Sequence, residues 1–424
     1  MIKSTILRFI KSKNPDVIVQ SPSRINLINP LDAVEGDYWM PSVAINGMNN
    51  PLSVFVYLKK IDEVSKIKIY DLKGINEEKI TLKNEKKIPL KKLSDFKDKF
   101  SSEFKLVFAS IYRLAKTNSL FWERFKNTNL EIGVITTIPR QSGLGGSASI
   151  IIALMFGLCK YFDILNNLSS IKEGEYPLNR DILAELATKV EDQDLGITAG
   201  YGDRYVICRG GLSFCSYYGK LHHKNIGKEP LAVYDKIDDL YNIEKLPIVI
   251  CYSGVIHESG GVHKKLRSVY LSGDSVLKEN YKKLAELSWK SRFVLMQKDW
   301  KTLGTFFRDN TRIMNNVMDH VGFKFGIGLA NNILIKIIEE HPKVYAAKLT
   351  GAGGGGSVFA LTEPSSVNEV KEYWKNRLQK IISNENLFKS KFPKYPIDIM
   401  EKLNNAKFFG IKIDKKGVKD LKTN

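Results

Sequence analysis

A glycine- and serine-rich loop at residues 139–149 constrains this chain more than any other feature. It follows a β-like run at residues 130–138 and leads directly into an apolar helix predicted over residues 150–161. Glycine permits tight turns and leaves no Cβ between the backbone amides and a ligand. The helix N-terminus adds unpaired N–H groups and the positive end of the helix dipole. The sequence therefore predicts an anion site, and phosphate is the usual anion at such a loop.

The loop does not carry the Walker A motif, because GxxxxGK[ST] occurs nowhere in the chain. A phosphate-binding loop here would belong to another lineage. A plain glycine-rich turn is the alternative that the loop alone leaves open.

The chain has 424 residues, too many for one ordinary core, which predicts two domains. Segments of strand and helix character mix without regular βα alternation, which favours an α+β fold over a doubly wound sheet. A helix is predicted over residues 181–192 with Asn179 as its cap, and a strand over residues 205–217 with a break at Gly210 and Gly211. A polar, irregular segment at residues 222–243 is a candidate domain boundary.

The composition is typical of a folded protein, and the sequence shows neither a membrane-spanning run nor metal-ligand spacing of its cysteines. Hydrophobic residues make up 43% of the chain and aromatic residues 10%. The longest apolar run, residues 150–158, is too short to cross a bilayer, and residues 1–13 do not resemble a signal peptide. The cysteines lack metal-ligand spacing. We therefore expect a cytoplasmic protein with no membrane partner and no cysteine-bound metal.

The formal net charge is +19 at pH 7. Nucleic-acid binding is one interpretation of such a charge. The lysines are scattered and no nucleic-acid module is visible, which favours a lysine-rich solvated surface. We therefore expect no nucleic-acid partner.

Three segments rich in glycine or small polar residues occur in order along the chain. The first runs from Ser21 to Asp32 (SPSRINLINPLD), the second is the loop at 139–149, and the third runs from Lys348 to Gly356 (KLTGAGGGG). Their order and content resemble the three motifs of the GHMP kinases, a family that includes galactokinase, homoserine kinase, mevalonate kinase and phosphomevalonate kinase.

The resemblance is closest to glucuronokinases. Residues 138–141 read Ile-Pro-Arg-Gln, as in the glucuronokinase phosphate loop, and residues 191–205 and 258–263 are also similar. The similarity runs from about residue 17 to residue 361 and does not include the C-terminal tail.

The resemblance implies a fold and a domain organisation. We expect an N-terminal ATP-binding lobe like ribosomal protein S5 domain 2 over residues 1–225. A ferredoxin-like C-terminal lobe with a charged tail would cover residues 226–424, and the site would lie in the cleft between the lobes.

Family similarity also assigns the nucleotide site. The residues expected to bind the phosphates of ATP are Gln141, Ser142, Gly143, Leu144, Gly145, Gly146, Ser147 and Ala148. Ser147 and Glu191 are expected to ligate Mg²⁺, which prefers one or two protein oxygens beside phosphates and water. The alternatives are an ordinary capping serine and a solvated glutamate.

Asp203 is the expected catalytic residue, because the family has an aspartate here that orients or deprotonates the acceptor hydroxyl. Arg24 would either pair with Asp203 or face the transferring phosphate, and a structural salt bridge is its alternative. Asp32 would bind sugar hydroxyls unless it only forms a turn. Substrate binding is also expected from Arg204, Gly353 and Gly354.

Arg140, Arg204 and Arg312 are candidates to hold a substrate carboxylate, and the sequence does not choose among them. The expected function is ATP-dependent phosphorylation of a sugar hydroxyl, with the anomeric hydroxyl of glucuronate as the preferred acceptor. The alternatives are another acceptor (galactose, a heptose phosphate or mevalonate) and a non-catalytic sugar or nucleotide sensor on the same fold.

Overall fold

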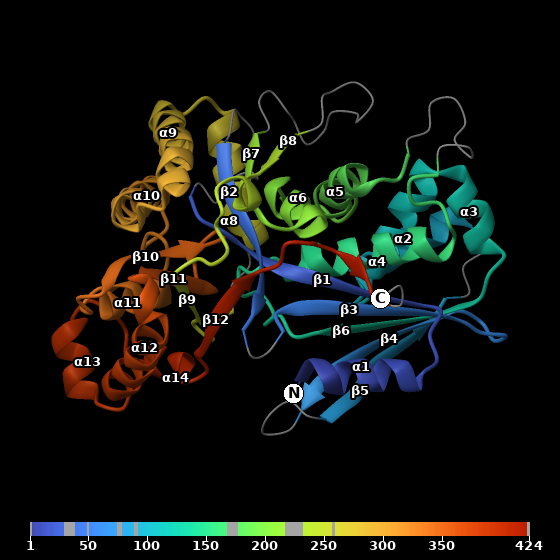
Figure 1. Ribbon diagram of the computed structural model, residues 1–424, viewed down its shortest axis with the longest axis horizontal. Coiled ribbons are helices and arrows are strands. Elements are labelled where there is room, and N and C mark those ends of the chain that lie inside the picture. The colour runs from blue at the N-terminus through green and yellow to red at the C-terminus, as the bar shows by residue number, and fades with distance from the viewer. Residues whose placement is uncertain are drawn as a thin grey trace.

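One hydrogen-bonded sheet runs through both halves of the molecule. The computed structural model describes residues 2–28, 39–48, 51–73, 79–88, 92–167, 177–216, 232–256 and 259–421. Within these residues the main path of strands is β10-β11-β9-β12-β2-β1-β3-β6-β4-β5. Helices and strands are mixed, and the α+β prediction is confirmed (Figure 1).

The N-terminal half holds six strands of this path: β1 (Val17–Asn26), β2 (Trp39–Gly47), β3 (Ser53–Lys60), β4 (Lys66–Lys73), β5 (Lys79–Lys87) and β6 (Leu130–Thr136). Strand β1 changes partner along its length, because residues 17–22 pair with β3 and residues 23–26 pair with β2. Strands β4 and β6 are parallel, and the other neighbours in this half are antiparallel. The change of partner places the end of β1 where the two halves meet.

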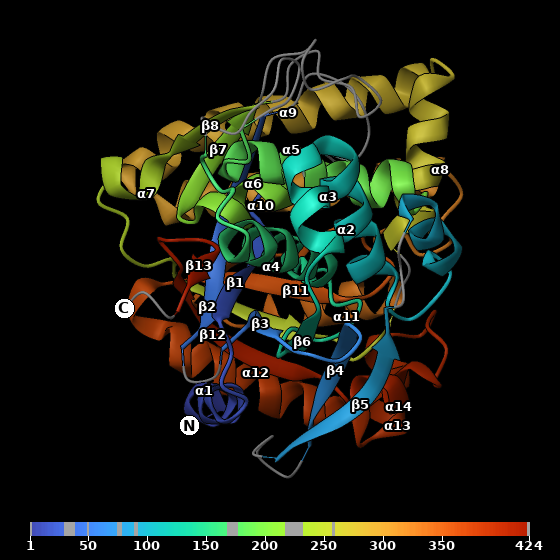
Figure 2. The same ribbon diagram turned by 90° about the vertical axis from the view of Figure 1, so that its right-hand side faces the viewer.

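Helices cover both faces of the strands β1, β3, β6 and β4 (Figure 2). The apolar helix α4 (Gly146–Tyr161) packs on one face and contacts β1 and β3. The short helix α1 (Ile2–Ser12) covers the other face with Ile2, Ile6 and Ile10, whose spacing puts them on one side of a helix. Helix α1 was not among the elements expected from the sequence.

The remaining elements of the N-terminal half are η1 (Leu93–Lys99), α2 (Lys105–Thr117), α3 (Ser119–Lys126), α5 (Arg180–Lys189), the π-helical turn η2 (Val190–Asp194), α6 (Gly202–Arg209), β7 (Leu212–Ser216), β8 (Val233–Lys236) and α7 (Ile237–Leu240). The predicted cap of α5 is confirmed, since the Asn179 side chain accepts a hydrogen bond of 2.9 Å from the backbone N–H of Ile182.

The strand predicted over residues 205–217 is wrong in its first part. Residues 202–209 form helix α6, and only Leu212–Ser216 is a strand. Aromatic and β-branched residues such as Tyr205, Val206 and Ile207 favour strands locally, but packing of α6 against α5 buries them in a helix. Gly210, with φ of 76°, ends the helix.

The C-terminal half contains β9 (Ile248–Tyr252), α8 (Ser259–Leu271), α9 (Ser275–Gln297), α10 (Trp300–His320), α11 (Leu329–Ile338), β10 (Val344–Thr350), β11 (Ser357–Thr362), η4 (Pro364–Ser366), α12 (Val367–Ile382), α13 (Glu385–Lys391), α14 (Ile399–Leu403), β12 (Lys407–Ile413) and β13 (Lys419–Asp420). Its strands are antiparallel in the order β10-β11-β9-β12. None of the helices in the described ranges is long and apolar enough to span a membrane.

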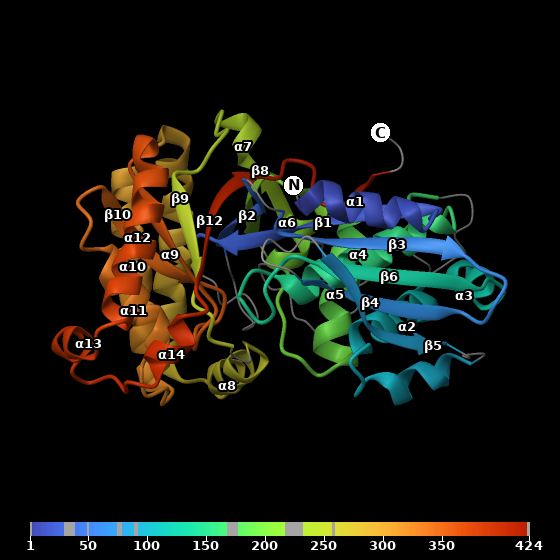
Figure 3. The same cartoon turned by 90° about the horizontal axis from the view of Figure 1, so that it is seen from below.

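Strand β12 joins the two halves (Figure 3). Residues 407–410 pair with β9, and residues 411–413 pair with β2. Strand β13 then pairs with β1 at Val19 and Gln20. The segment expected as a charged tail therefore returns to the N-terminal strands. The boundary proposed at residue 225 lies outside the described residues.

Candidate active site

The glycine-rich loop is anchored to strand β1 through its carbonyl groups. The backbone N–H of Arg24 and the hydroxyl of Ser23 both donate to the carbonyl oxygen of Leu144, at 3.2 and 2.7 Å. The guanidinium of Arg24 donates to the carbonyl oxygen of Gly143. Helix α4 begins at Gly146, after Gly145 in the left-handed region. The first N–H groups of α4 have no helical partner and are suited to an anion.

The loop packs directly against the third motif, backbone against backbone. A Cβ at Gly143 would lie 2.7 Å from the carbonyl oxygen of Thr350, and one at Gly356 would lie 2.9 Å from the carbonyl oxygen of Ser142. Both glycines also have positive φ, of 70° and 78°. Glycine is required at both positions, because a side chain would separate the two motifs.

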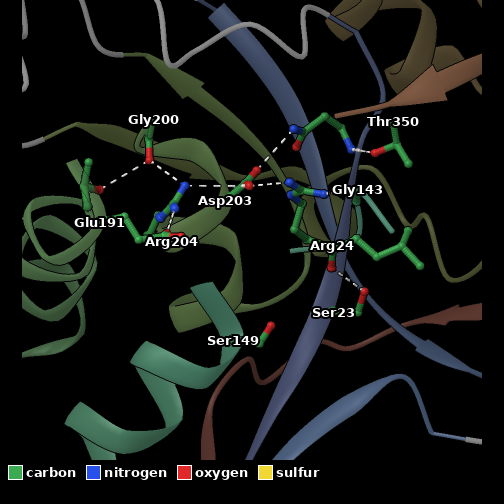
Figure 4. Close-up of polar contacts among 12 residues, drawn as sticks. Ser23, Arg24, Gly143, Ser149, Glu191, Gly200, Asp203, Arg204 and Thr350 are labelled. Carbon is green, nitrogen blue, oxygen red and sulfur yellow. Dashed lines mark hydrogen bonds and ion pairs between the residues drawn. The ribbon is translucent and has the colours of Figure 1, made fainter. Parts of the chain in front are cut away.

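Asp203 lies at the start of helix α6, with both carboxylate oxygens engaged. Arg24 forms an ion pair with Oδ2, and Nδ2 of Asn26 donates to Oδ1 at 3.2 Å. Arg204 adds a longer ion-pair contact of 3.7 Å to Oδ2. The side chain of Asp203 is 12% exposed, which leaves a small opening for another group. In Figure 4 these residues form a row from Glu191 through Arg204 and Asp203 to Arg24.

Glu191 lies in the π-helical turn η2, a form often found at functional sites. Its Oε2 forms an ion pair with Arg204, which also donates to the carbonyl oxygen of Gly200 at 2.9 Å. Oε1 of Glu191 makes no hydrogen bond to the described residues. Arg204 therefore orients Glu191, and no described residue occupies its other carboxylate oxygen.

Two arginines from neighbouring helices form ion pairs with aspartates of the turn η2. Arg113 of α2 pairs with Asp194, with a shortest distance of 2.6 Å, and Arg267 of α8 pairs with Asp192 at 2.7 Å. All four side chains are largely buried. The position of Glu191 therefore depends on both α2 and α8.

Ser147 is the second residue of α4 and is half-buried. Its hydroxyl makes no hydrogen bond to the residues that the structure describes. The described residues contain no cluster of three or more histidine, cysteine, aspartate or glutamate side chains suited to a metal. A hydroxyl and one carboxylate, completed by phosphates and water, suit Mg²⁺ better than a metal that needs a full protein cage. The pairing of Ser147 with Glu191 as Mg²⁺ ligands stays a prediction.

The structure describes some of the expected substrate residues and not others. Asp32 lies outside the described residues. Gly353 is buried against the carbonyl oxygen of Ile327, and Gly354 is exposed. Both belong to the loop of the third motif, and their role in substrate binding stays a prediction.

The three candidate arginines differ in their surroundings. Arg140 is exposed, and its carbonyl oxygen accepts a 3.4 Å hydrogen bond from Tyr252. Arg312 is also exposed and pairs with Asp309 at 3.0 Å. Arg204 is buried and engaged with Glu191 and Gly200. Arg140 is thus the candidate that adjoins the phosphate loop and is exposed.

Asn26, Lys348 and Thr350 have no individual role that the sequence alone predicts. Lys348 is fully buried in β10, where burial lowers the pKa of its ammonium group to about 7. It forms no ion pair with an acidic residue of the described ranges. The sequence could have indicated Lys348, because it is a charged residue within the apolar segment Val344–Thr350.

Comparison with protein families identifies both halves of the chain. Residues 107–211 match the profile described as GHMP kinases N terminal domain, and residues 295–380 match GHMP kinases C terminal. The chain belongs to the GHMP kinases. The family recognised in the sequence is thereby confirmed, and the N-terminal match covers the loop, Glu191 and Asp203.

Curated relatives include proteins named as two kinds of sugar kinase. Probable glucuronokinase 2 of Arabidopsis thaliana is 28% identical over 246 residues, which cover 58% of this chain and 60% of the relative. D-glycero-alpha-D-manno-heptose 7-phosphate kinase of Campylobacter jejuni is 24% identical over 244 residues, 57% of this chain and 63% of the relative. The match thus spans about three fifths of the length of each relative.

Solved structures share the fold over most of this chain. Lactococcus lactis galactokinase complexed with galactose has a TM-score of 0.63 at 16% identity, covering 96% of this chain and 95% of its own. A mevalonate kinase has a TM-score of 0.56 at 17% identity, covering 94% and 99%. At these identities the likeness concerns the fold alone.

Proposed function

We propose that this protein transfers the γ-phosphoryl group of ATP to a sugar hydroxyl, with the anomeric hydroxyl of glucuronate as the acceptor. The product would be the sugar 1-phosphate. Membership of the GHMP kinases supports the reaction class, and the 28% identity to two Arabidopsis thaliana proteins named glucuronokinase supports the choice of sugar.

One observation carries the proposal. The guanidinium of Arg24 bonds both the carboxylate of Asp203 and the carbonyl oxygen of Gly143 in the phosphate loop. A single side chain therefore ties the proposed acceptor carboxylate to the proposed phosphate site. Phosphoryl transfer depends on alignment and charge stabilisation more than on covalent chemistry, so this closeness suits it.

In the proposed reaction, Asp203 accepts or orients the proton of the acceptor hydroxyl. The hydroxyl oxygen forms a bond to the γ-phosphorus as the bond from that phosphorus to the β-phosphate oxygen breaks, which releases ADP. Arg24 holds the carboxylate of Asp203 in place before the transfer. The backbone amides of residues 142–147 and the N-terminus of α4 bind the phosphates.

Mg²⁺ fits the residues available. The Ser147 hydroxyl and Oε1 of Glu191 have no hydrogen bond within the described residues, and we assign both to the ion. The bound ion would neutralise phosphate charge during transfer. Arg204 would hold Glu191 in the orientation needed for this contact.

The carboxylate of glucuronate requires a cation in the site. Arg140 is the favoured group, because it is exposed beside the phosphate loop while Arg204 is engaged with Glu191. A guanidinium forms two parallel hydrogen bonds with a carboxylate. Arg140 and Arg204 are compared directly by substitution with methionine, and only the residue that binds the carboxylate should raise the KM for glucuronate without affecting a neutral sugar.

The test is ADP release with MgATP across a panel of glucuronate, galacturonate, galactose, glucose, arabinose, fucose, a heptose phosphate and mevalonate. Glucuronate should be turned over best, and ³¹P NMR should place the new phosphate on the anomeric carbon. Faster turnover of another acceptor in the panel would contradict the choice of glucuronate but would still support a kinase activity. ATP binding without ADP release from any acceptor would instead support a sensor.

A further inference from the structure

Asn26, the last residue of β1, is held on three sides. Its backbone N–H donates to Oγ1 of Thr350 at 3.1 Å, and its carbonyl oxygen accepts from Nζ of Lys348 at 3.4 Å. Its side-chain Nδ2 donates to Oδ1 of Asp203 at 3.2 Å. Asn26 is 1% exposed, so water does not compete for these contacts. Figure 4 shows Thr350 and Asp203 on opposite sides of this strand end.

The two groups that hold the Asn26 main chain come from one strand of the C-terminal half. Lys348 and Thr350 are two residues apart in β10, so their side chains emerge on the same face. Asn26 belongs to β1 of the N-terminal half, 322 residues from Lys348 in sequence. The contact therefore fixes one half of the molecule to the other at the residue that bonds Asp203.

Lys348 is a costly residue to bury. Its ammonium group has the carbonyl oxygens of Asn26 and Leu349 as partners, the latter at 2.8 Å, and lies 4.9 Å from the ring centre of Phe359. These contacts offset part of the loss of hydration, but no carboxylate of the described residues compensates the charge. An apolar side chain would serve a purely structural strand better.

The carboxylate of Asp203 cannot rotate freely while both oxygens are engaged. Arg24 engages Oδ2, and the Asn26 amide engages Oδ1. The direction of the amide depends on the backbone of Asn26, which Thr350 and Lys348 hold. A shift of about 1 Å in a positioned group lowers a rate by about 100-fold in unfavourable cases.

We propose that Lys348 and Thr350 are positioning residues, which clamp the main chain of Asn26 so that its amide orients Asp203 toward the acceptor hydroxyl. This inference rests on the proposed function of Asp203 and extends it to the second half of the molecule. It assigns to the third motif a role besides the close approach of its glycines.

The first test compares steady-state kinetics of Thr350→Val and Lys348→Met with the wild type. Each variant should lower kcat by about tenfold or more, with the KM for ATP and for the acceptor changed by less than about twofold. Thr350→Ser, which keeps the hydroxyl, should restore most of the kcat. The matched control is Thr362→Val in β11, because within the described ranges the buried Thr362 hydroxyl bonds only main-chain carbonyls, those of Glu363 and Pro247. It should leave kcat unchanged.

The second test asks whether the effect passes through Asn26. Asn26→Ala should lower kcat by a similar factor, and Asn26→Ala combined with Thr350→Val should be no slower than Asn26→Ala alone. Losses that multiply in the double variant would overturn the clamp. Melting curves of all variants identify any that fail to fold. If Lys348→Met does not fold, the kcat of Thr350→Val alone tests the proposal.

The controls separate the two proposals. Normal kcat in Thr350→Val and Lys348→Met, beside an inactive Asp203→Ala, overturns the clamp and leaves the proposed function standing. Full activity of Asp203→Ala overturns both.

Discussion

Gly143 of the phosphate loop lies so close to Thr350 of β10 that a Cβ on Gly143 would be 2.7 Å from the Thr350 carbonyl oxygen. The contact joins two motifs more than 200 residues apart in sequence. Position 143 therefore requires glycine for two reasons, since a side chain would collide with Thr350 and the backbone has a positive φ.

The first prediction concerns this contact. Gly143→Ala should lower the free energy of unfolding by about 2 kcal/mol or more, because alanine disfavours the left-handed conformation and its methyl group would collide with a main-chain oxygen. It should also weaken ATP binding. Thermal melting and calorimetric titration with ATP measure the two effects.

The control for that substitution is Gly261→Ala in helix α8. A Cβ at Gly261 meets nothing within 4 Å, and no positive φ is imposed there. Alanine in place of this glycine in the first turn of α8 should leave stability unchanged or raise it by up to about 1 kcal/mol. Equal melting temperatures for Gly143→Ala and the wild type would contradict the close packing of the motifs.

A second prediction concerns the metal. Glu191→Gln removes the negative charge but keeps the shape, so the Mg²⁺ concentration that gives half-maximal ADP release should rise by about tenfold. Glu401→Gln changes an exposed glutamate of α14 and should leave the Mg²⁺ dependence unaltered. An unchanged Mg²⁺ curve for Glu191→Gln would remove Glu191 from the metal site.

The buried lysine predicts a pH dependence of stability. Burial lowers the pKa of Lys348 to about 7 in the folded protein, from 10.5 in an exposed lysine. Between these values the unfolded chain binds more protons than the folded chain, so this residue makes the free energy of unfolding increase with pH. Below about pH 7 the cost of burying the charge is fully present.

Lys348→Met isolates this contribution from other titrating groups. The difference in unfolding free energy between Lys348→Met and the wild type should change by a few kcal/mol from pH 6.5 to pH 9.5, in the direction that favours the wild type at high pH. Urea denaturation at several pH values measures it. A difference that is constant with pH would show that Lys348 keeps its ordinary pKa.

Local sequence was sufficient for the elements whose signals are local. The glycine-rich loop between a strand and an apolar helix, and the cap of α5 at Asn179, follow from turn chemistry and capping. The sequence did not predict α6 as a helix, because Tyr205, Val206 and Ile207 have strand propensity and only packing against α5 overrides it.

The site itself depends on contacts that no local pattern contains. Family resemblance predicts Asp203 and Arg24, but the hydrogen bond from Asn26 to Asp203 joins residues 177 positions apart. Lys348 was visible in the third motif, yet its burial and its contact with Asn26 arise only when β10 meets the end of β1. The return of β12 and β13 to the N-terminal strands likewise depends on pairing between distant segments.

The central claim is that Asp203 acts on the acceptor hydroxyl in a phosphoryl transfer. Its most direct test is the initial rate of ADP release by Asp203→Ala beside the wild type, at saturating MgATP and the best acceptor of the panel. The account predicts a rate lower by about 1,000-fold or more, with ATP affinity largely retained. A rate equal to that of the wild type would contradict it.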